Sequence, residues 1–224
     1  MEDRERFYAA CARGGAPGAQ AHALMSMSVA AQARFSEVIG LHEPDVVLRR
    51  DLGILISVIL DKTHKMTLNA YPRVCARYPG RFLAHDAFFP VSHYLATCAG
   101  RDESSLPVPG RPFFTKLVCR ADGSYAAGTE PLDADYARAL LLRFLKAADI
   151  ADADALLNFS LHFARTSGFS DLANKMFLGR LLAAEAGGWA EGGCVAESYQ
   201  RRTAEDLASA LHISLVRVGR DLRW

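Results

Sequence analysis

The stretch VVLRRDLGILISVILDKTHKM, residues 46–66, decides the fold class of this chain. Its middle, Leu52–Leu60, is the most apolar run, and it is far shorter than the roughly 20 residues that a membrane-spanning helix needs. Pro44 and Asp45, which precede the stretch, suit the first turn of a helix. The pattern therefore predicts a central helix that is buried on all sides, with 52–60 fully buried. Its β-branched residues leave a strand as the alternative, because periodicity alone does not separate the two.

Helical periodicity continues on both sides of this stretch, so the expected fold class is mainly α. On the N-terminal side, the sequence GGAPG at residues 14–18 is a cluster of helix breakers. On the C-terminal side, Pro90 suits the start of a helix, and Asp133 suits an N-cap. The expected helices are 2–12, 22–39, 44–66, a short helix that contains Val74 and Cys75, 90–100, 133–147, 152–166, 170–186 and 194–201.

One β element is expected within this helical body. Residues 113–128 contain two strand-favouring runs on either side of Asp122-Gly123, a dipeptide that suits a type I′ hairpin turn. The polar, Pro-rich loop 101–112 precedes this hairpin and is the best candidate for a domain boundary. We therefore divide the chain into an N-terminal helical region (1–100), a loop and hairpin (101–130), and a C-terminal helical region (131–224).

Composition narrows the class of protein. The 224 residues carry 26 basic and 25 acidic side chains, so the net charge of +1 gives no overall attraction to nucleic acid. The first residues lack the apolar segment of a secretory signal, which favours a cytoplasmic protein without a membrane role. The five cysteines are odd in number and never form a C-x-x-C pair, which argues against a disulfide framework or a zinc knuckle. They are Cys11, Cys75, Cys98, Cys119 and Cys194.

Motifs of nucleotide binding and acyl transfer are missing: there is no G-x-S-x-G, no G-x-x-x-x-G-K-[ST] and no G-x-G-x-x-G after a strand. His64, His85-Asp86 and a later Asp133 or Asp135 resemble the His, His-Asp, Asp order of metal-dependent phosphohydrolases. In that family the His-Asp pair lies within an apolar helix, whereas here Pro90 follows closely. We therefore interpret His85 and His93 as core or interface residues and predict no catalytic residue, metal ligand or cofactor, although an enzyme is not excluded.

Aromatic residues cluster before and within the helix expected at 90–100. They are Phe82, Phe88, Phe89 and Tyr94. Such a cluster can form the floor of a ligand pocket, but aromatic side chains at this spacing are more often part of a core. We interpret them as core residues.

The last residues, RRTAEDLASALHISLVRVGRDLRW (201–224), contain two short helical patterns separated by a turn. Thr203 and Asp206 form a start similar to a capping box, and Ser214 suits the cap of the second helix. Apolar residues recur at three- and four-residue steps in both segments. In the second segment, Arg217 and Arg220 lie off the apolar stripe and share the exposed face.

Two short helices around a tight turn resemble the helix-turn-helix of bacterial DNA-binding regulators, and the match covers residues 203–222 within a terminal unit at 190–224. His212 in the turn and Gly219 in the second helix depart from the usual pattern. The resemblance implies that the second helix enters the major groove of DNA. The residues expected to contact DNA are Arg201, Arg202, Ser214, Arg217, Arg220 and Arg223.

The sequence therefore supports two functions from different classes. The leading interpretation is a cytoplasmic, non-enzymatic transcription regulator that binds DNA as a homodimer or together with a protein partner. The alternative is a helical adaptor or scaffold subunit of a multiprotein assembly, with no role in nucleic-acid binding. An enzyme with a metal ion is the third possibility.

Overall fold

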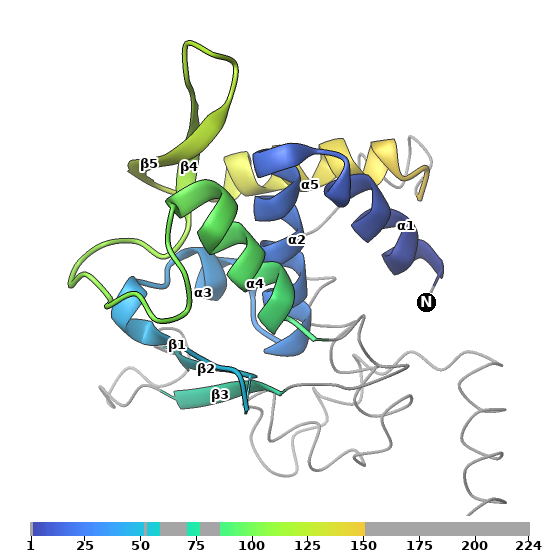
Figure 1. Ribbon diagram of the computed structural model, residues 1–224. Helices are drawn as coiled ribbons and strands as arrows, with labels where there is room; N and C mark the ends of the chain where they lie inside the picture. The colour runs from blue at the N-terminus through green and yellow to red at the C-terminus, as the bar shows by residue number, and fades with distance from the viewer. Residues whose placement is uncertain (1, 52, 59–70, 77–85, 151–224) are drawn as a thin grey trace, which may run out of the picture.

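The structure is a computed structural model that describes residues 2–51, 53–58, 71–76 and 86–150 (Figure 1). Half of these residues, 50%, are helical and 20% are in strands, which form two small antiparallel sheets. The expectation of a mainly helical protein is therefore wrong. The elements in chain order are α1 (Glu2–Ala12), α2 (Gly15–Ala30), α3 (Phe35–Ile39), the 3₁₀ turn η1 (Glu43–Asp45), β1 (Val46–Arg49), β2 (Gly53–Val58), β3 (Tyr71–Ala76), α4 (Phe88–Tyr94), the π-helical segment η3 (Leu95–Ala99), β4 (Thr115–Cys119), β5 (Tyr125–Pro131) and α5 (Ala134–Ala147).

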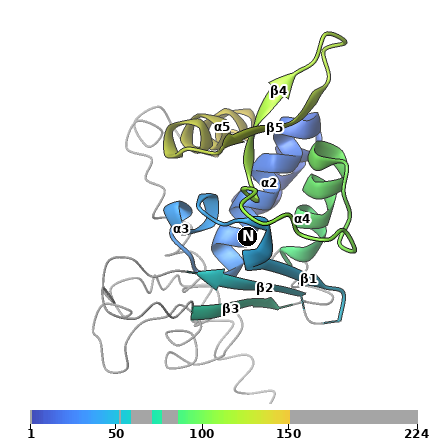
Figure 2. The same ribbon diagram turned by 90° about the vertical axis from the view of Figure 1, so that its left-hand side faces the viewer.

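The central helix is α2, and α1, α4 and α5 pack around it (Figures 1 and 2). Every residue from Pro17 to Val29 except His22 is buried. The helix begins at Gly15 instead of the expected residue 22, because Pro17 lies in the first turn, where its missing N–H costs no hydrogen bond. Gly18 lets α1 approach closely, since a Cβ at this position would overlap the carbonyl oxygen of Cys11. Gly18, which the sequence suggested as a helix breaker, is thus a packing residue within α2.

The helix expected at 22–39 is two helices. Gln32, which follows α2, has a φ of 49°, and the main-chain N–H of Ala33 donates to the carbonyl of Ser28 at 3.0 Å. Many helices end in this way, with one residue in the left-handed conformation and a longer-range hydrogen bond from the residue that follows it. The residue is more often Gly, so the sequence carried no stop signal here, and the chain turns before α3.

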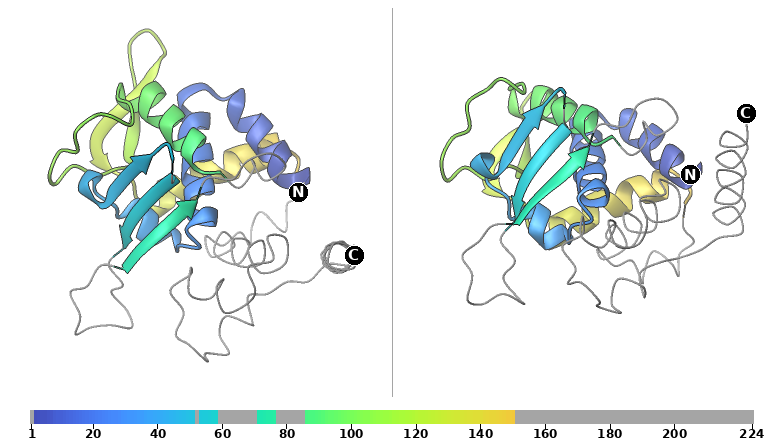
Figure 3. Two further views of the ribbon diagram at one scale, coloured as in Figure 1. Left: turned by 60° about the horizontal axis from the view of Figure 1, so that its bottom comes forward. Right: turned by 90° about the horizontal axis from the view of Figure 1, so that it is seen from below.

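The stretch expected to be the central helix forms β1 and β2 of a three-stranded sheet, in the order β1-β2-β3 (Figure 3). Val46 pairs with Ile56, and burial follows the period of two that defines a strand: Ile54 and Ile56 are buried, Leu55 is half-buried and Ser57 is exposed. The prediction that all of 52–60 is buried is therefore wrong. The strand alternative, favoured by the β-branched residues, is the correct one. The short helix expected around Val74 and Cys75 is also wrong, because these residues belong to β3, where they pair with Leu55 and Ile54 of β2.

Both α4 and α5 confirm expectations. The helix expected from Pro90 to Gly100 is found as α4 and η3, which end at Gly100 in the left-handed conformation. The helix expected at 133–147 is α5, and the carboxylate of Asp133 accepts a hydrogen bond of 2.7 Å from the main-chain N–H of Tyr136. The helices expected at 152–166, 170–186 and 194–201, and the helix-turn-helix, lie outside the described residues.

The hairpin expected at 113–128 is confirmed as β4 and β5, which project away from the helices (Figures 1 and 2). Its turn is not type I′, because that turn needs a positive φ at Asp122, and only Gly123 has one, at 79°. The N–H of Gly123 donates to the carbonyl of Arg120 at 3.0 Å. The N–H of Arg120 donates to the main-chain carbonyl of Ser124 at 2.7 Å. This is the three-residue hairpin loop with Gly in the left-handed position.

A single cluster of buried apolar side chains holds these elements together. It includes Phe7, Leu24 and Phe35 from the N-terminal side of loop 101–112, and Phe114 and Leu141 from its C-terminal side. Among the residues that the structure describes, no helix is both long and apolar enough to cross a membrane.

Candidate functional site

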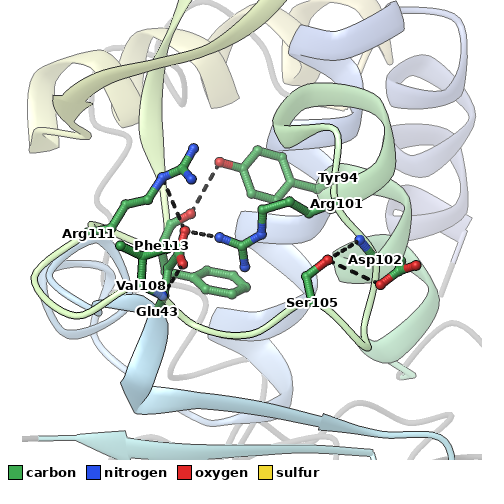
Figure 4. Close-up of polar contacts among 8 residues, drawn as sticks. All are labelled: Glu43, Tyr94, Arg101, Asp102, Ser105, Val108, Arg111 and Phe113. Carbon is green, nitrogen blue, oxygen red and sulfur yellow. Dashed lines mark hydrogen bonds and ion pairs between the residues drawn. The ribbon is translucent and has the colours of Figure 1, made fainter.

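The most distinctive polar cluster in the described structure is centred on Glu43, at the start of η1 (Figure 4). The side chain of Glu43 is only 3% exposed, and a buried carboxylate requires ionic or hydrogen-bonding partners. One carboxylate oxygen, Oε2, accepts a hydrogen bond of 2.8 Å from the main-chain N–H of Val108. The other, Oε1, receives the guanidinium groups of Arg101 and Arg111. The carboxylate thus has partners on both oxygens.

The two arginines belong to opposite ends of loop 101–112. Arg101 follows the left-handed Gly100 at the end of η3, and its Nη1 donates to Oε1 of Glu43. Arg111 forms an ion pair with the same oxygen through its Nε atom, at 3.2 Å. Figure 4 shows the two guanidinium groups approaching the carboxylate from different directions. Glu43 therefore fixes both ends of the loop and, through Val108, its middle.

Further contacts hold the loop in place. The N–H of Glu43 donates to the carbonyl of Arg111 at 2.9 Å, and the N–H of Phe113 donates to the carbonyl of Leu41 at 2.8 Å. At the other end, Asp102 accepts hydrogen bonds from the N–H and the hydroxyl of Ser104, at 2.9 and 2.7 Å. These bonds lower the pKa of the Asp102 carboxyl. The loop is consequently a fixed feature of the surface.

The tip of this fixed loop is apolar. Leu106 is 87% exposed, more than any other large apolar side chain among the residues described, and Val108 is 48% exposed. Pro107 and Pro109 flank Val108, and proline restricts the backbone to φ near −65°. A loop that is held at both ends and presents apolar side chains loses little conformational entropy on binding. The arrangement suits recognition of another protein.

The residues expected to contact DNA all lie outside the described part of the chain, so the structure does not place Arg201, Arg202, Ser214, Arg217, Arg220 or Arg223. The same is true of His64 and His85 from the pattern that resembles metal-dependent phosphohydrolases.

The acidic residues of that pattern have structural roles. Asp86 is buried, and its carboxylate accepts a hydrogen bond of 2.9 Å from the N–H of Phe88 at the start of α4. Asp133 caps α5. Nowhere in the described ranges do three or more His, Cys, Asp or Glu side chains gather as a metal site would require.

The aromatic cluster is divided between core and surface. Phe88 and Tyr94 are buried, as expected, and Tyr94 packs against the rings of Phe113 and Phe114 with centroids 6.4 and 5.0 Å away. Phe89 is 52% exposed, so the core interpretation is wrong for that residue. Phe82 lies outside the described residues.

Sequence reasoning identified loop 101–112 but not the residues that anchor it. The available signal was an arginine at each end of a Pro-rich loop, but the acidic partner is Glu43, 58 positions before Arg101. No local pattern reports such a pairing.

Comparison with known proteins assigns the chain to no family. No protein-family model matches the chain, and no curated protein is significantly similar to it.

Proposed function

We propose that this protein is an adaptor that binds another protein through the tip of loop 101–112. The observation that carries the proposal is the exposure of Leu106 and Val108 on a loop held by the buried Glu43. Interfaces of this kind place an apolar anchor in a pocket of the partner, and a handful of such anchors supplies most of the binding energy. Leu106, which is 87% exposed on a loop anchored at both ends, is placed to be one.

The test is co-purification of the tagged full chain from its native source, with nuclease treatment, comparing wild type with Leu106→Asp. A charge at the tip costs the loop little in water but is unfavourable in an apolar pocket. Proteins that the wild type captures should be lost from the variant. The matched control is Val118→Asp, which changes an exposed apolar residue of the β4–β5 hairpin that is 56% exposed. Equal capture by wild type and Leu106→Asp excludes the loop as the binding site.

A second candidate is DNA binding by residues 201–224. The observation that favours it is compositional: this segment has five arginines against three acidic residues, in a chain of nearly neutral charge. Each phosphate contact of an arginine releases counterions, so binding would weaken with salt. The Arg217→Ala, Arg220→Ala double variant should bind DNA more weakly, with a salt slope reduced by about one unit for each lost phosphate contact. No DNA affinity of the folded wild type at low salt, alone or with its native partners, excludes this function.

A further inference from the structure

The charges at Glu43 do not balance. Two guanidinium groups, those of Arg101 and Arg111, pair with a single oxygen of one carboxylate, and the second oxygen is occupied by the N–H of Val108. Arg101 is only 16% exposed. Burial, and then the nearby positive charge of Arg111, lower the pKa of Arg101. The cluster therefore has one positive charge more than Glu43 offsets.

Arg111 has the geometry to receive a second anion. It contacts Glu43 through Nε, and the edge formed by its two terminal nitrogens takes no part in that ion pair (Figure 4). The side chain is 40% exposed, so this edge is accessible. Within residues 2–51, 53–58, 71–76 and 86–150, no acceptor pairs with the terminal nitrogens of Arg111. By contrast, Arg49 uses both Nε and Nη2 on the carboxylate of Asp51.

A planar guanidinium whose orientation is fixed by one carboxylate is preorganised to bind another oxyanion with two parallel hydrogen bonds. We propose that the outer edge of Arg111, supported by the charge of Arg101, is a binding site for a carboxylate or a phosphate group. The proposal does not depend on Leu106 or on a protein partner, because the site is tested with small anions.

The experiment follows the arginine Nε–H signals of the ¹⁵N-labelled full chain by NMR. Sodium phosphate is added in one series and sodium acetate in another, with sodium chloride keeping the ionic strength constant. The Arg111 signal is assigned by its loss in Arg111→Lys, and the main-chain amides of Val108, Gly110, residue 111 and Phe113 report binding in every variant. The matched control is Arg49→Lys, which changes an arginine paired with Asp51.

The expected result is a saturable shift of the Arg111 Nε–H signal with at least one of the two anions. Because lysine lacks the two-pronged geometry, Arg111→Lys should weaken that binding about tenfold, while Arg49→Lys leaves it unchanged. Saturation by phosphate or by acetate identifies the class of ligand. Shifts that do not saturate, or that affect all arginines alike, overturn the proposal. If Arg111→Lys does not fold, saturable shifts of the wild-type main-chain amides of Val108, Gly110, Arg111 and Phe113 decide instead.

Discussion

The side-chain amide of Gln20 in α2 donates a hydrogen bond of 2.7 Å to the main-chain carbonyl of Thr115, 95 positions later in the chain. Both residues are buried, and Thr115 is the first residue of β4. The hydroxyl of Tyr94 donates to the carbonyl of Phe113, two residues before Thr115, at 3.3 Å. Polar side chains of α2 and α4 thus hold the base of the hairpin at the first residue of β4 and at a residue just before it. This explains how a two-stranded hairpin, which is marginal in isolation, is fixed to the body.

Replacing Gln20 with Leu should destabilise the protein by about 1 kcal/mol. The variant leaves the buried carbonyl of Thr115 without its donor, which by itself costs about 1 to 3 kcal/mol. It also removes Oε1 of Gln20, a buried oxygen with no partner among the described residues, so part of the cost is recovered. Urea denaturation measures the change, and hydrogen exchange should be faster in β4 than in α5. An unchanged midpoint would show that this bond does not hold the hairpin.

Replacing Gly18 with Ala should destabilise the contact between α1 and α2. The new Cβ would overlap the main-chain carbonyl of Cys11, which moves only if α1 moves. Overpacking of this kind typically costs about 1 to 3 kcal/mol. The comparison is Gly40→Ala, where the nearest atom, the carbonyl oxygen of Ser36, is 3.1 Å from the new Cβ. Thermal unfolding should show a clear loss for Gly18→Ala only, and similar melting temperatures for the two variants would contradict this reading of the helix contact.

These contacts show which parts of the fold the sequence could predict. The predictions that rested on a local sequence signal were correct: Asp133 is an N-cap, and Asp122-Gly123 lies in a hairpin turn. Residues 46–58 were predicted incorrectly, because their apolar run suits a buried helix or a strand equally. Pairing with β3 favours the strand over the helix. Within β3, Pro72 pairs with Ser57 of β2, and a proline at this position is typical of an edge strand. That partner is distant in sequence, so periodicity could not detect it.

The candidate site was only partly predictable for the same reason. The composition of loop 101–112 indicated an exposed, Pro-rich segment, which is what the structure has. Its role depends on Glu43, which follows His42 and precedes Pro44 and looks like an ordinary acidic residue of a helix first turn. Its burial arises from the bridge between His42 and Pro112, a pairing that brings loop and turn together. No signal within either segment specifies it.

Stability should fall between pH 6.5 and pH 4 because of His22. Burial, and then the charge of His93, lower the pKa of His22 from 6.5 to about 4. Above pH 6.5 the residue is neutral in both states, and its neutral form is stable in the fold, where its ring lies 4.1 Å from that of Tyr8. As the pH falls toward 4, the unfolded chain binds a proton that the folded chain does not, so the free energy of unfolding decreases by at most about 3 kcal/mol.

The measurement is urea denaturation across this pH range for wild type and His22→Gln. The variant cannot take up this proton, so its stability should change less than that of wild type between pH 6.5 and pH 4. His93→Gln is the control, because His93 is exposed on α4 and its removal should leave most of the decrease in place. Parallel curves for wild type and His22→Gln would refute the assignment to His22.

Thiol reagents should distinguish Cys119 from the buried cysteines. Burial raises the pKa of the Cys11 and Cys98 thiols to about 12, so neither forms appreciable thiolate near neutral pH, and the thiolate is the reactive species. Cys75 is also buried, whereas Cys119 is exposed at the end of β4. Brief iodoacetamide treatment of the folded protein followed by peptide mass spectrometry should find Cys119 modified and Cys11, Cys75 and Cys98 protected. Rapid modification of Cys11 would contradict the packing of α1 on α2.

Glu43→Gln should be the most destabilising of these substitutions. Glutamine keeps the shape and an acceptor oxygen, but Arg101 and Arg111 then lie together without a counter-charge, and Arg101 is 16% exposed. Removing one partner of a buried ion pair costs roughly 3 to 5 kcal/mol, and the 40% exposure of Arg111 places the expected loss near the lower value. The control is Glu103→Gln in the same loop, whose partner Arg50 is 81% exposed, and surface pairs of this kind contribute little. Urea denaturation should separate the two variants clearly, and amide hydrogen exchange at Val108 should rise only in Glu43→Gln. Equal stability of the two variants would show that Glu43 does not anchor the loop.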